Sequence, residues 1–279
     1  MILTLRQLKA KVRNMSKGDS LKAQTIMRHY AMERFLERLS LSGYRNNLIL
    51  KGGVLVSAII GIDNRSTMDI DTTVKNFTLT EKSAREAVAE IANIIIADGM
   101  SFKITNVEPI MDEADYPGVR VKLETFLETM SISFKIDFSA GDVITPQEVS
   151  YAFKLLFEER SIPILAYNIE TVLAEKIETI IARGPANSRM RDFYDIYAIE
   201  STHTQSIDYS LLKSALANTS KKRGSSHILD DRDMILNEIE GSPEMLVLWE
   251  NYQRKFDYAS EITWNEAMQS IRRFVTYCF

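Results

Sequence analysis

Two aspartates separated by a single residue, Asp69 and Asp71, are the side chains of this sequence best suited to binding a metal ion. They lie in residues 68–74, where alternating polar and apolar residues predict a β-strand. Residues i and i+2 of a strand point to the same face, so both carboxylates would lie together while Ile70 points into the core. Like charges this close repel, so the pair favours a hard cation such as Mg²⁺, which binds carboxylates together with substrate phosphates. A second Asp-x-Asp triplet, at residues 231–233, follows a loop instead of a strand and is typical of solvated or helix-start charges.

A third carboxylate, that of Asp137, lies on a second predicted strand, residues 130–138. Apolar side chains alternate with polar ones along this strand, which predicts one core face and one polar face that carries Asp137. If the two strands are neighbours, three acids converge, and such a cluster can hold two Mg²⁺ ions that serve an in-line displacement on an NTP. A solvent-facing aspartate beside Lys135 could equally form a surface ion pair, so the sequence leaves both roles open.

Two glycines, Gly52 and Gly53, separate a predicted strand at residues 47–50 from a predicted helix at residues 54–62. Glycine lets the backbone approach a phosphate closely, and the N-terminus of a helix favours anions. Nearby basic side chains could neutralise phosphate charge, an arginine by a two-pronged contact. We therefore expect the triphosphate of an NTP to be bound by Lys51, Gly52, Gly53, Arg65 and Ser66.

The second half of the chain carries a further set of candidate residues. Lys176 falls within the apolar stripe of a predicted helix, residues 167–184. Its ammonium either reaches water along the edge of the core or lies at a cleft where it meets phosphate, and we favour the cleft. Asp192 and Asp195 share one face of the next helix at i and i+3, with Arg189 preceding them. From spacing alone, Asp192 is a helix cap, a partner of Arg189 or a catalytic base, and the role of Asp195 is open.

The elements that must position these side chains change in type along the chain. Apolar residues recur at helical spacing in residues 21–41 and 81–98, and apolar residues alternate with polar ones in three later segments. This order predicts that the first part of the chain is α/β. The three alternating segments are residues 102–109, 119–126 and 130–138. Beyond residue 146 the pattern is helical almost to the end, apart from an apolar strand-like piece at residues 161–166. We predict an α/β domain over residues 1–160 and a helical domain over residues 161–279.

Composition and charge exclude several classes of protein. With 279 residues, 45% hydrophobic and 26% charged, the chain is typical of a globular protein, not a disordered or collagen-like one. The single cysteine, Cys278, excludes an intramolecular disulfide and a Cys-rich zinc site, and the three scattered histidines argue against a histidine metal site. Neither a membrane-spanning run of about 18 apolar residues nor a signal peptide is present, so we expect a cytoplasmic protein without a membrane partner.

The charge balance limits how the chain could meet a nucleic acid. Its formal net charge of −4 excludes a general basic surface, so an RNA would have to contact local basic groups. Three such groups are present, and each could equally be an ordinary solvated face; they are Arg6 with Lys9 and Arg13, the run of residues 221–223, and Arg272 with Arg273.

Three blocks of the sequence together resemble the AbiEii/AbiGii toxin family of nucleotidyltransferases, within the DNA polymerase β-like superfamily. The blocks are LKGGVLVSAIIGIDNRSTMDIDTTV, LAEKIETIIARG and RDFYDIYAI, and the upstream segment YAMERFLERLSLSGYRNNLILKGG matches as well. The resemblance covers about residues 21–199. It implies an α/β fold, with a polymerase β-like nucleotidyltransferase domain built on a mixed sheet and followed by a mainly α-helical C-terminal domain.

The resemblance also implies an activity. It points to a toxin of a type IV toxin–antitoxin pair, used in abortive infection against phage. Such a toxin would need Mg²⁺ or Mn²⁺ and would transfer NMP from an NTP to RNA. The expected acceptor is the tRNA 3′ end. By position, Asp69 and Asp71 match the metal-binding pair, and Lys176 and Asp192 match the other two catalytic residues. Asp137 matches a third metal ligand by strand order. A cognate antitoxin from a neighbouring gene is expected, without direct binding.

Two other functions stay open at this point. The same metal site could transfer a nucleotide to a small molecule or to a protein hydroxyl, because only the acceptor cleft would differ. A non-catalytic nucleotide-binding or RNA-binding module would keep the fold and lose the chemistry. The superfamily usually has Gly-Ser where this chain has Gly52 and Gly53, so a serine contact to phosphate is missing here.

Overall fold

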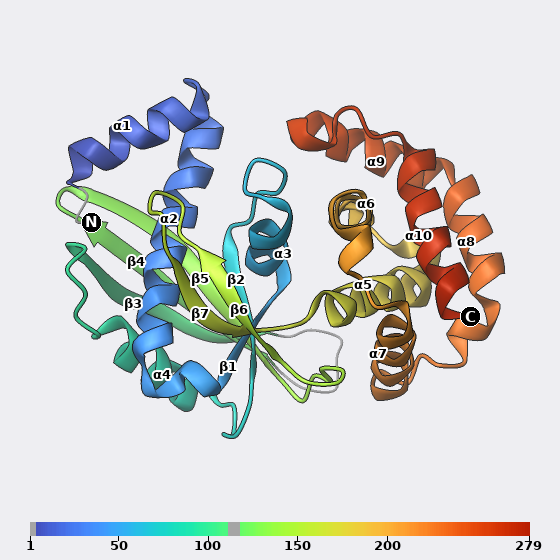
Figure 1. The fold of residues 1–279 in the computed structure, drawn as a ribbon, viewed down its shortest axis with the longest axis horizontal. Coiled ribbons are helices and arrows are strands. Elements are labelled where there is room, and N and C mark those ends of the chain that lie inside the picture. Colours follow the sequence, from blue (N-terminus) through green and yellow to red (C-terminus); the bar gives the residue numbers. More distant parts are fainter. Residues whose placement is uncertain (1–3, 111–117) are drawn as a thin grey trace. The chain divides into compact units, whose positions relative to one another are not determined.

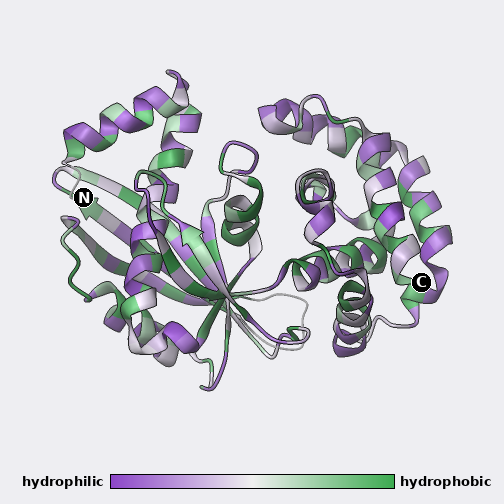
Figure 2. Ribbon diagram, viewed as in Figure 1, coloured by the Kyte–Doolittle hydropathy of each residue, from purple (hydrophilic) through white to green (hydrophobic). Residues whose placement is uncertain are grey.

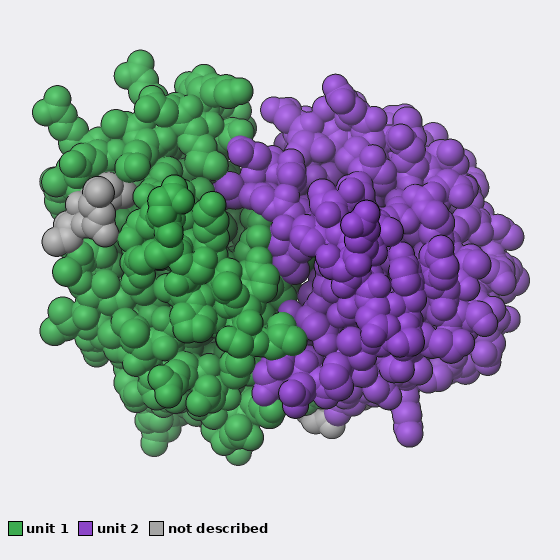
Figure 3. Space-filling view, in the orientation of Figure 1, with its two compact units in different colours: residues 1–58, 66–141, 149–166 green, residues 59–65, 142–148, 167–279 purple. Residues whose placement is uncertain are grey.

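The computed structural model describes residues 4–110 and 118–279 (Figure 1). It divides into two compact units that are interleaved along the chain, shown in different colours in Figure 3. Unit 1 comprises residues 1–58, 66–141 and 149–166, and unit 2 comprises residues 59–65, 142–148 and 167–279. The division into two domains at residue 160 stays a prediction.

Within the described residues, unit 1 is built on a seven-stranded mixed sheet in the order β3-β4-β5-β2-β1-β7-β6. β2 runs parallel to β5 and β1 runs parallel to β7, whereas the other neighbouring strands are antiparallel. The predicted α/β class with a mixed sheet is confirmed. The strands are β1 Leu48–Lys51, β2 Asp69–Val74, β3 Met100–Ile110, β4 Gly118–Leu127, β5 Met130–Ala140, β6 Val149–Lys154 and β7 Ser161–Ala166.

One face of this sheet is covered by helices. The helices of unit 1 are α1 Leu5–Ser16, α2 Ser20–Leu41, the start of α3 Gly52–Ile60, and α4 Glu81–Ala92. α2 contacts β5 and β7, while α4 contacts α2, β3 and β4. Phe35 of α2 packs edge-on against Phe134 of β5, with ring centroids 6.1 Å apart. Because side chains alternate across a strand, Lys135 and Asp137 point to the face opposite α2.

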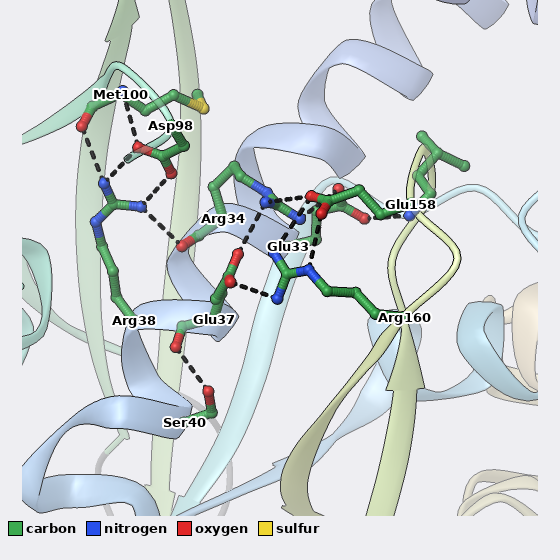
Figure 4. Close-up of polar contacts among 10 residues, drawn as sticks. Glu33, Arg34, Glu37, Arg38, Ser40, Asp98, Met100, Glu158 and Arg160 are labelled. Carbon is green, nitrogen blue, oxygen red and sulfur yellow. Dashed lines mark hydrogen bonds and ion pairs between the residues drawn. The ribbon is translucent and has the colours of Figure 1, made fainter. Parts of the chain in front are cut away.

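A network of charged side chains joins α2 to the rest of unit 1 (Figure 4). The guanidinium of Arg38 donates to both carboxylate oxygens of Asp98, at 2.6 and 2.8 Å. Arg34 donates to Glu33 and to Glu158, at 3.1 and 2.9 Å. Burial raises the pKa of Glu33 to about 7, although Arg34 and a backbone N–H favour its charged form. The network therefore holds a carboxyl that titrates near neutral pH.

Unit 2 is mainly helical. Its helices are α5 Ile169–Arg183, α6 Met190–His203, α7 Tyr209–Lys222, α8 Arg232–Gly241, α9 Pro243–Lys255 and α10 Trp264–Cys278. Asn168 caps α5 by accepting the Thr171 N–H, and the residue that follows the end of α5 is Gly184, whose φ of +53° favours glycine. α5 packs against α7, and α6 packs against α10. Figure 2 shows hydrophobic residues concentrated on α3 and along the strands, whereas α1 alternates between hydrophobic and hydrophilic positions.

Two expectations from the sequence were wrong in detail. The helix expected over residues 81–98 ends at Ala92, and Asp98 instead accepts hydrogen bonds from Arg38. The segment after residue 146 was expected to be helical, yet it forms strand β6, because β7 offers it a complete antiparallel ladder from Val149 to Lys154. Among the described helices, none is long and apolar enough to cross a membrane.

Candidate active site

The three aspartates singled out in the sequence meet on two adjacent parallel strands. In the β2–β5 register, Asp71 lies opposite Asp137 and Asp69 lies opposite Lys135. Oxygens of the three carboxylates all lie within 4.8 Å of one another. Ile70, between the two aspartates of β2, is fully buried, as strand alternation requires. The fold therefore gathers a carboxylate cluster, which we call the aspartate cluster, from residues 69, 71 and 137.

Two cations lie directly against the aspartate cluster. Arg120, opposite Asp137 on β4, binds its carboxylate with two hydrogen bonds, Nε to Oδ1 at 2.8 Å and a terminal nitrogen to Oδ2 at 2.7 Å. The Nζ of Lys135 lies 3.2 Å from Asp69 Oδ2 and 3.8 Å from Asp137 Oδ2. Asp137 is thus both a member of the aspartate cluster and an ion-pair partner, and its role as a metal ligand stays a prediction. Sequence reasoning missed Arg120, because only the strand register brings it there.

The residues present fit a hard divalent cation. Carboxylate oxygens are the ligands that Mg²⁺ and Mn²⁺ prefer, and three of them converge here from two rigid strands. Because Arg120 holds both oxygens of Asp137, the carboxylates of Asp69 and Asp71 are the more available ligands. Burial and the neighbouring charges of Asp69 and Asp137 raise the pKa of Asp71 to about 6. A cation at this point would relieve that repulsion.

The glycine turn serves the aspartate cluster directly. α3 begins at Gly52, whose φ is +64°, and a Cβ on this residue would lie 2.0 Å from Asp71 Oδ2. The N–H of Gly53 donates to the same oxygen at 3.3 Å. Lys51 lies opposite Asp71 in the β1–β2 register. The glycines therefore let the start of a helix approach a carboxylate, a role that the sequence analysis did not assign to them.

Lys176 lies in unit 2, where two carboxylates receive its ammonium. Its Nζ donates to Asp192 Oδ1 at 2.7 Å and lies 2.8 Å from Asp195 Oδ2. Burial disfavours the charge of Lys176, but the two carboxylates outweigh it and raise the pKa of the ammonium. Asp192 also accepts from Arg189 Nε at 2.9 Å, and these cations lower its pKa to about 2 against the effect of burial. The group is therefore a cluster of ionised side chains.

Arg65, which the sequence analysis expected to contact phosphate, is bound by a carboxylate of unit 2. It belongs to unit 2, its side chain is 1% exposed, and its Nε donates to Asp195 Oδ1 at 2.6 Å. Asp195, whose role the sequence left open, is therefore the shared partner of Arg65 and Lys176. Its spacing from Asp192 on an otherwise apolar helix face was the one signal that could have indicated this. Ser66 belongs to unit 1 and is half-buried.

Carboxylates on neighbouring strands of a mixed sheet, beside a helix that starts with glycine, define the nucleotidyltransferase class that the sequence blocks resembled. Residues 34–273 match the family model described as nucleotidyl transferase AbiEii toxin, type IV toxin–antitoxin system. The chain belongs to this family and is a nucleotidyltransferase. Membership implies a cognate antitoxin.

Solved structures similar to this chain include a nucleotidyltransferase toxin. MenT4, a nucleotidyltransferase toxin from Mycobacterium tuberculosis, superposes with a TM-score of 0.58 at 14% identity, covering 97% of this chain and 98% of its own. JHP933 from Helicobacter pylori gives a TM-score of 0.49 at 13% identity, covering 91% of this chain and 93% of its own. Among curated proteins, none matches the chain significantly.

Proposed function

We propose that this nucleotidyltransferase transfers NMP from an NTP to an RNA acceptor, and that the acceptor is the 3′ end of tRNA. The observation that carries the proposal is the convergence of Asp69, Asp71 and Asp137 beside the glycine start of α3. In the reaction, the acceptor hydroxyl oxygen forms a bond to the α-phosphorus while the bond from that phosphorus to the bridging oxygen breaks. Pyrophosphate leaves, and the hydroxyl proton ends in solvent.

Asp69 and Asp71 would hold Mg²⁺ or Mn²⁺ in this reaction, with Asp137 as the third carboxylate. A bound divalent cation supplies charge stabilisation for the transferring phosphoryl group. The aspartates keep fixed positions because each lies on a strand within the sheet, with Asp137 further held by Arg120. Rigid placement of this kind reduces the loss of entropy when nucleotide binds.

The backbone at the start of α3 is the proposed site of the triphosphate. Gly52 and Gly53 are the first residues of the helix, where N–H groups have no partner within the helix and the helix dipole favours anions. Lys51 precedes them and adds positive charge, and Ser66 precedes β2 in the same unit. Arg65, buried against Asp195, is left out of this set.

Lys176 and Asp192 keep the catalytic roles that the family resemblance implies for them. In their own unit they form an ion pair with Nζ 2.7 Å from Oδ1, which keeps the ammonium charged at neutral pH. The charged ammonium of Lys176 can neutralise a phosphate oxygen. Asp192 and Asp195 both bind this ammonium, and together they keep the Nζ of Lys176 in one position. We propose that this is what the pair contributes to nucleotide transfer.

The proposal is tested by incubating the protein with total tRNA, Mg²⁺ or Mn²⁺, and each of the four NTPs labelled at the α-phosphate. We expect label on tRNA with at least one NTP, and its loss when Asp69 and Asp71 are both changed to Asn. The matched control changes Asp231 and Asp233, two exposed aspartates with the same spacing, to Asn. It removes the same charge and should keep full activity.

Three results would count against the proposal. Label on a protein or small-molecule fraction with none on tRNA would assign a different acceptor. Equal activity of the two double variants would show that the aspartate cluster is not the site. If the protein binds Mn²⁺ and nucleotide but transfers no label with any of the four NTPs, it is a non-catalytic binding module and not the enzyme proposed.

A further inference from the structure

Helix α1 carries a row of exposed basic side chains. Arg6, Lys9 and Arg13 are exposed and follow one another at i, i+3 and i+7, so they lie along one side of the helix, and Lys17, the residue that follows the helix, is exposed as well. We call these four residues the basic stripe. Its helical part, from Arg6 to Arg13, extends over about 10 Å at ~1.5 Å per residue. In a chain of net charge −4, residues 4–18 contain no Asp or Glu.

The charges of the basic stripe are not neutralised within the described part of the chain. None of its four residues lies within ion-pair distance of a described carboxylate, whereas Arg34 and Arg38 of α2 and Arg120 of β4 are bound by acids. A hollow between α1 and the start of α2 is lined by Lys9 and Arg13. Asp19 also lines this hollow, but its carboxylate accepts the N–H groups of Leu21 and Lys22 as the cap of α2. The stripe is therefore a positive surface that no described carboxylate compensates.

The remaining faces of α1 indicate what kind of partner fits. Leu5, Leu8 and Val12 are buried, and α1 contacts α2. A helix that binds a lipid surface needs a free apolar face, and this one has none to insert. Protein interfaces depend on aromatic or aliphatic anchors, but the exposed side of α1 adds only polar residues and Ala10 to its cations. Multiple cations without anchors suit a phosphate backbone.

The position of α1 relative to the aspartate cluster fits an extended acceptor. The N–H of Leu5 donates to Glu128 in the turn between β4 and β5, at 3.0 Å. Asp137 lies seven residues along β5 from Met130, which is about 24 Å at ~3.4 Å per residue. A molecule that touches both the aspartate cluster and the Leu5 end of α1 must therefore extend along most of β5, to the side on which α1 packs against α2. A small-molecule acceptor cannot do so.

We propose that the basic stripe of α1 binds the sugar–phosphate backbone of the RNA acceptor whose end is modified at the aspartate cluster. This rests on the proposed function and adds to it the surface that recognises RNA. The contact reads phosphates instead of bases, so it gives affinity and orientation without sequence preference.

The test measures tRNA binding by a full-length variant in which Arg6, Lys9, Arg13 and Lys17 are changed to Gln. The control changes four exposed cations elsewhere to Gln, and so removes the same charge; they are Lys82, Arg85, Lys213 and Lys255. Fluorescence anisotropy with labelled tRNA gives Kd at several KCl concentrations. Circular dichroism and Mn²⁺ titration show that each variant is folded and keeps its metal site.

We expect the stripe variant to bind tRNA at least tenfold more weakly than the control variant, with a slope of log K against log[KCl] that is smaller by about three. Mn²⁺ affinity and label transfer to a short acceptor oligonucleotide should not change. Replacing the two arginines by Lys should retain binding, because each acts as a point charge on phosphate.

Equal tRNA affinity of the stripe and control variants would overturn the proposal. It would also be overturned if the protein does not bind tRNA but uses the stripe to bind anionic phospholipid vesicles or an acidic polypeptide. This failure can be told from failure of the proposed function. If wild-type protein binds tRNA through the stripe but transfers no label, the function fails and the surface stands. If it transfers label and the stripe variant binds tRNA as the control does, only the surface fails.

Discussion

Replacing Gly52 by Ala should disable the aspartate cluster without removing any of its ligands. The added Cβ would lie 2.0 Å from Oδ2, 2.6 Å from Cγ and 2.7 Å from Cβ of Asp71. Rotating the Asp71 side chain moves its oxygens and leaves its Cβ in place, so the contact can be relieved only if β2 or the start of α3 shifts. A tolerable contact needs a separation of at least about 3 Å, which requires a displacement of about 1 Å at the carboxylate.

Two energies contribute to this substitution and can be separated. An alanine at positive φ costs about 1 to 2 kcal/mol wherever it occurs. The clash adds about 1 to 3 kcal/mol, the usual range for overpacking a rigid site. Gly224 has a φ of +68°, close to the +64° of Gly52, and a Cβ there meets nothing within 4 Å. Gly224→Ala therefore carries the backbone strain alone and is the matched control.

Isothermal titration with Mn²⁺ is the assay, followed by label transfer at saturating Mn²⁺. We expect Gly52→Ala to weaken Mn²⁺ binding at least tenfold and to lower transfer by about a hundredfold, the usual effect of a 1 Å misplacement at a reacting centre. Gly224→Ala should bind Mn²⁺ and react as the wild type does. If Gly52→Ala also keeps wild-type Mn²⁺ affinity while remaining folded, the reasoning that the glycine exists to admit Asp71 is refuted.

Three further substitutions give separate tests. Folding raises the pKa of Glu33 from 4.5 to about 7, so the folded state holds this proton more tightly and its free energy of unfolding falls as pH rises through this range. Between pH 4.5 and 8, wild type should lose up to about 3 kcal/mol more than Glu33→Gln, measured by urea unfolding. Parallel curves of stability against pH for the two proteins would contradict this. Asp195→Asn leaves the 1% exposed Arg65 without its carboxylate and should cost about 3 to 5 kcal/mol, measured by calorimetry against wild type; a loss below 1 kcal/mol would show the pair to be dispensable. Arg120→Gln removes a cation and its two hydrogen bonds to Asp137, so Mn²⁺ should bind severalfold more tightly, and weaker binding would mean that Arg120 positions the site instead of competing with the metal.

Local patterns in the sequence were enough for the parts of the molecule that depend on near neighbours along the chain. Strand alternation placed Asp69 and Asp71 on one face with Ile70 buried between them, and it separated the polar from the apolar face of β5. These features follow from backbone geometry with a period of two residues, which any sequence segment displays by itself. The closeness of the carboxylates of Asp69 and Asp71 was predictable for the same reason.

Strand β6 shows where the sequence analysis overlooked a local pattern. Val149, Tyr151 and Phe153 alternate with Ser150, Ala152 and Lys154, a period of two that indicates a strand, although only Phe153 of these is buried. Its backbone hydrogen bonds come from β7, and pairing of this kind depends on what lies beside a segment in space. The early end of α4 at Ala92 has a similar origin, because Asp98 is used by Arg38 of α2.

The sequence by itself determined the chemistry on offer: paired carboxylates on a strand, a glycine start to a helix, and a lysine and two aspartates on helix faces. Only the tertiary structure decided which charges meet. The β4–β5 register brings Arg120 to Asp137, and the packing of unit 2 gives Asp195 to both Arg65 and Lys176. These partners lie from 17 to 130 residues apart along the chain. Ion pairs form between side chains within about 4 Å, a distance that folding sets and that spacing along the chain does not encode.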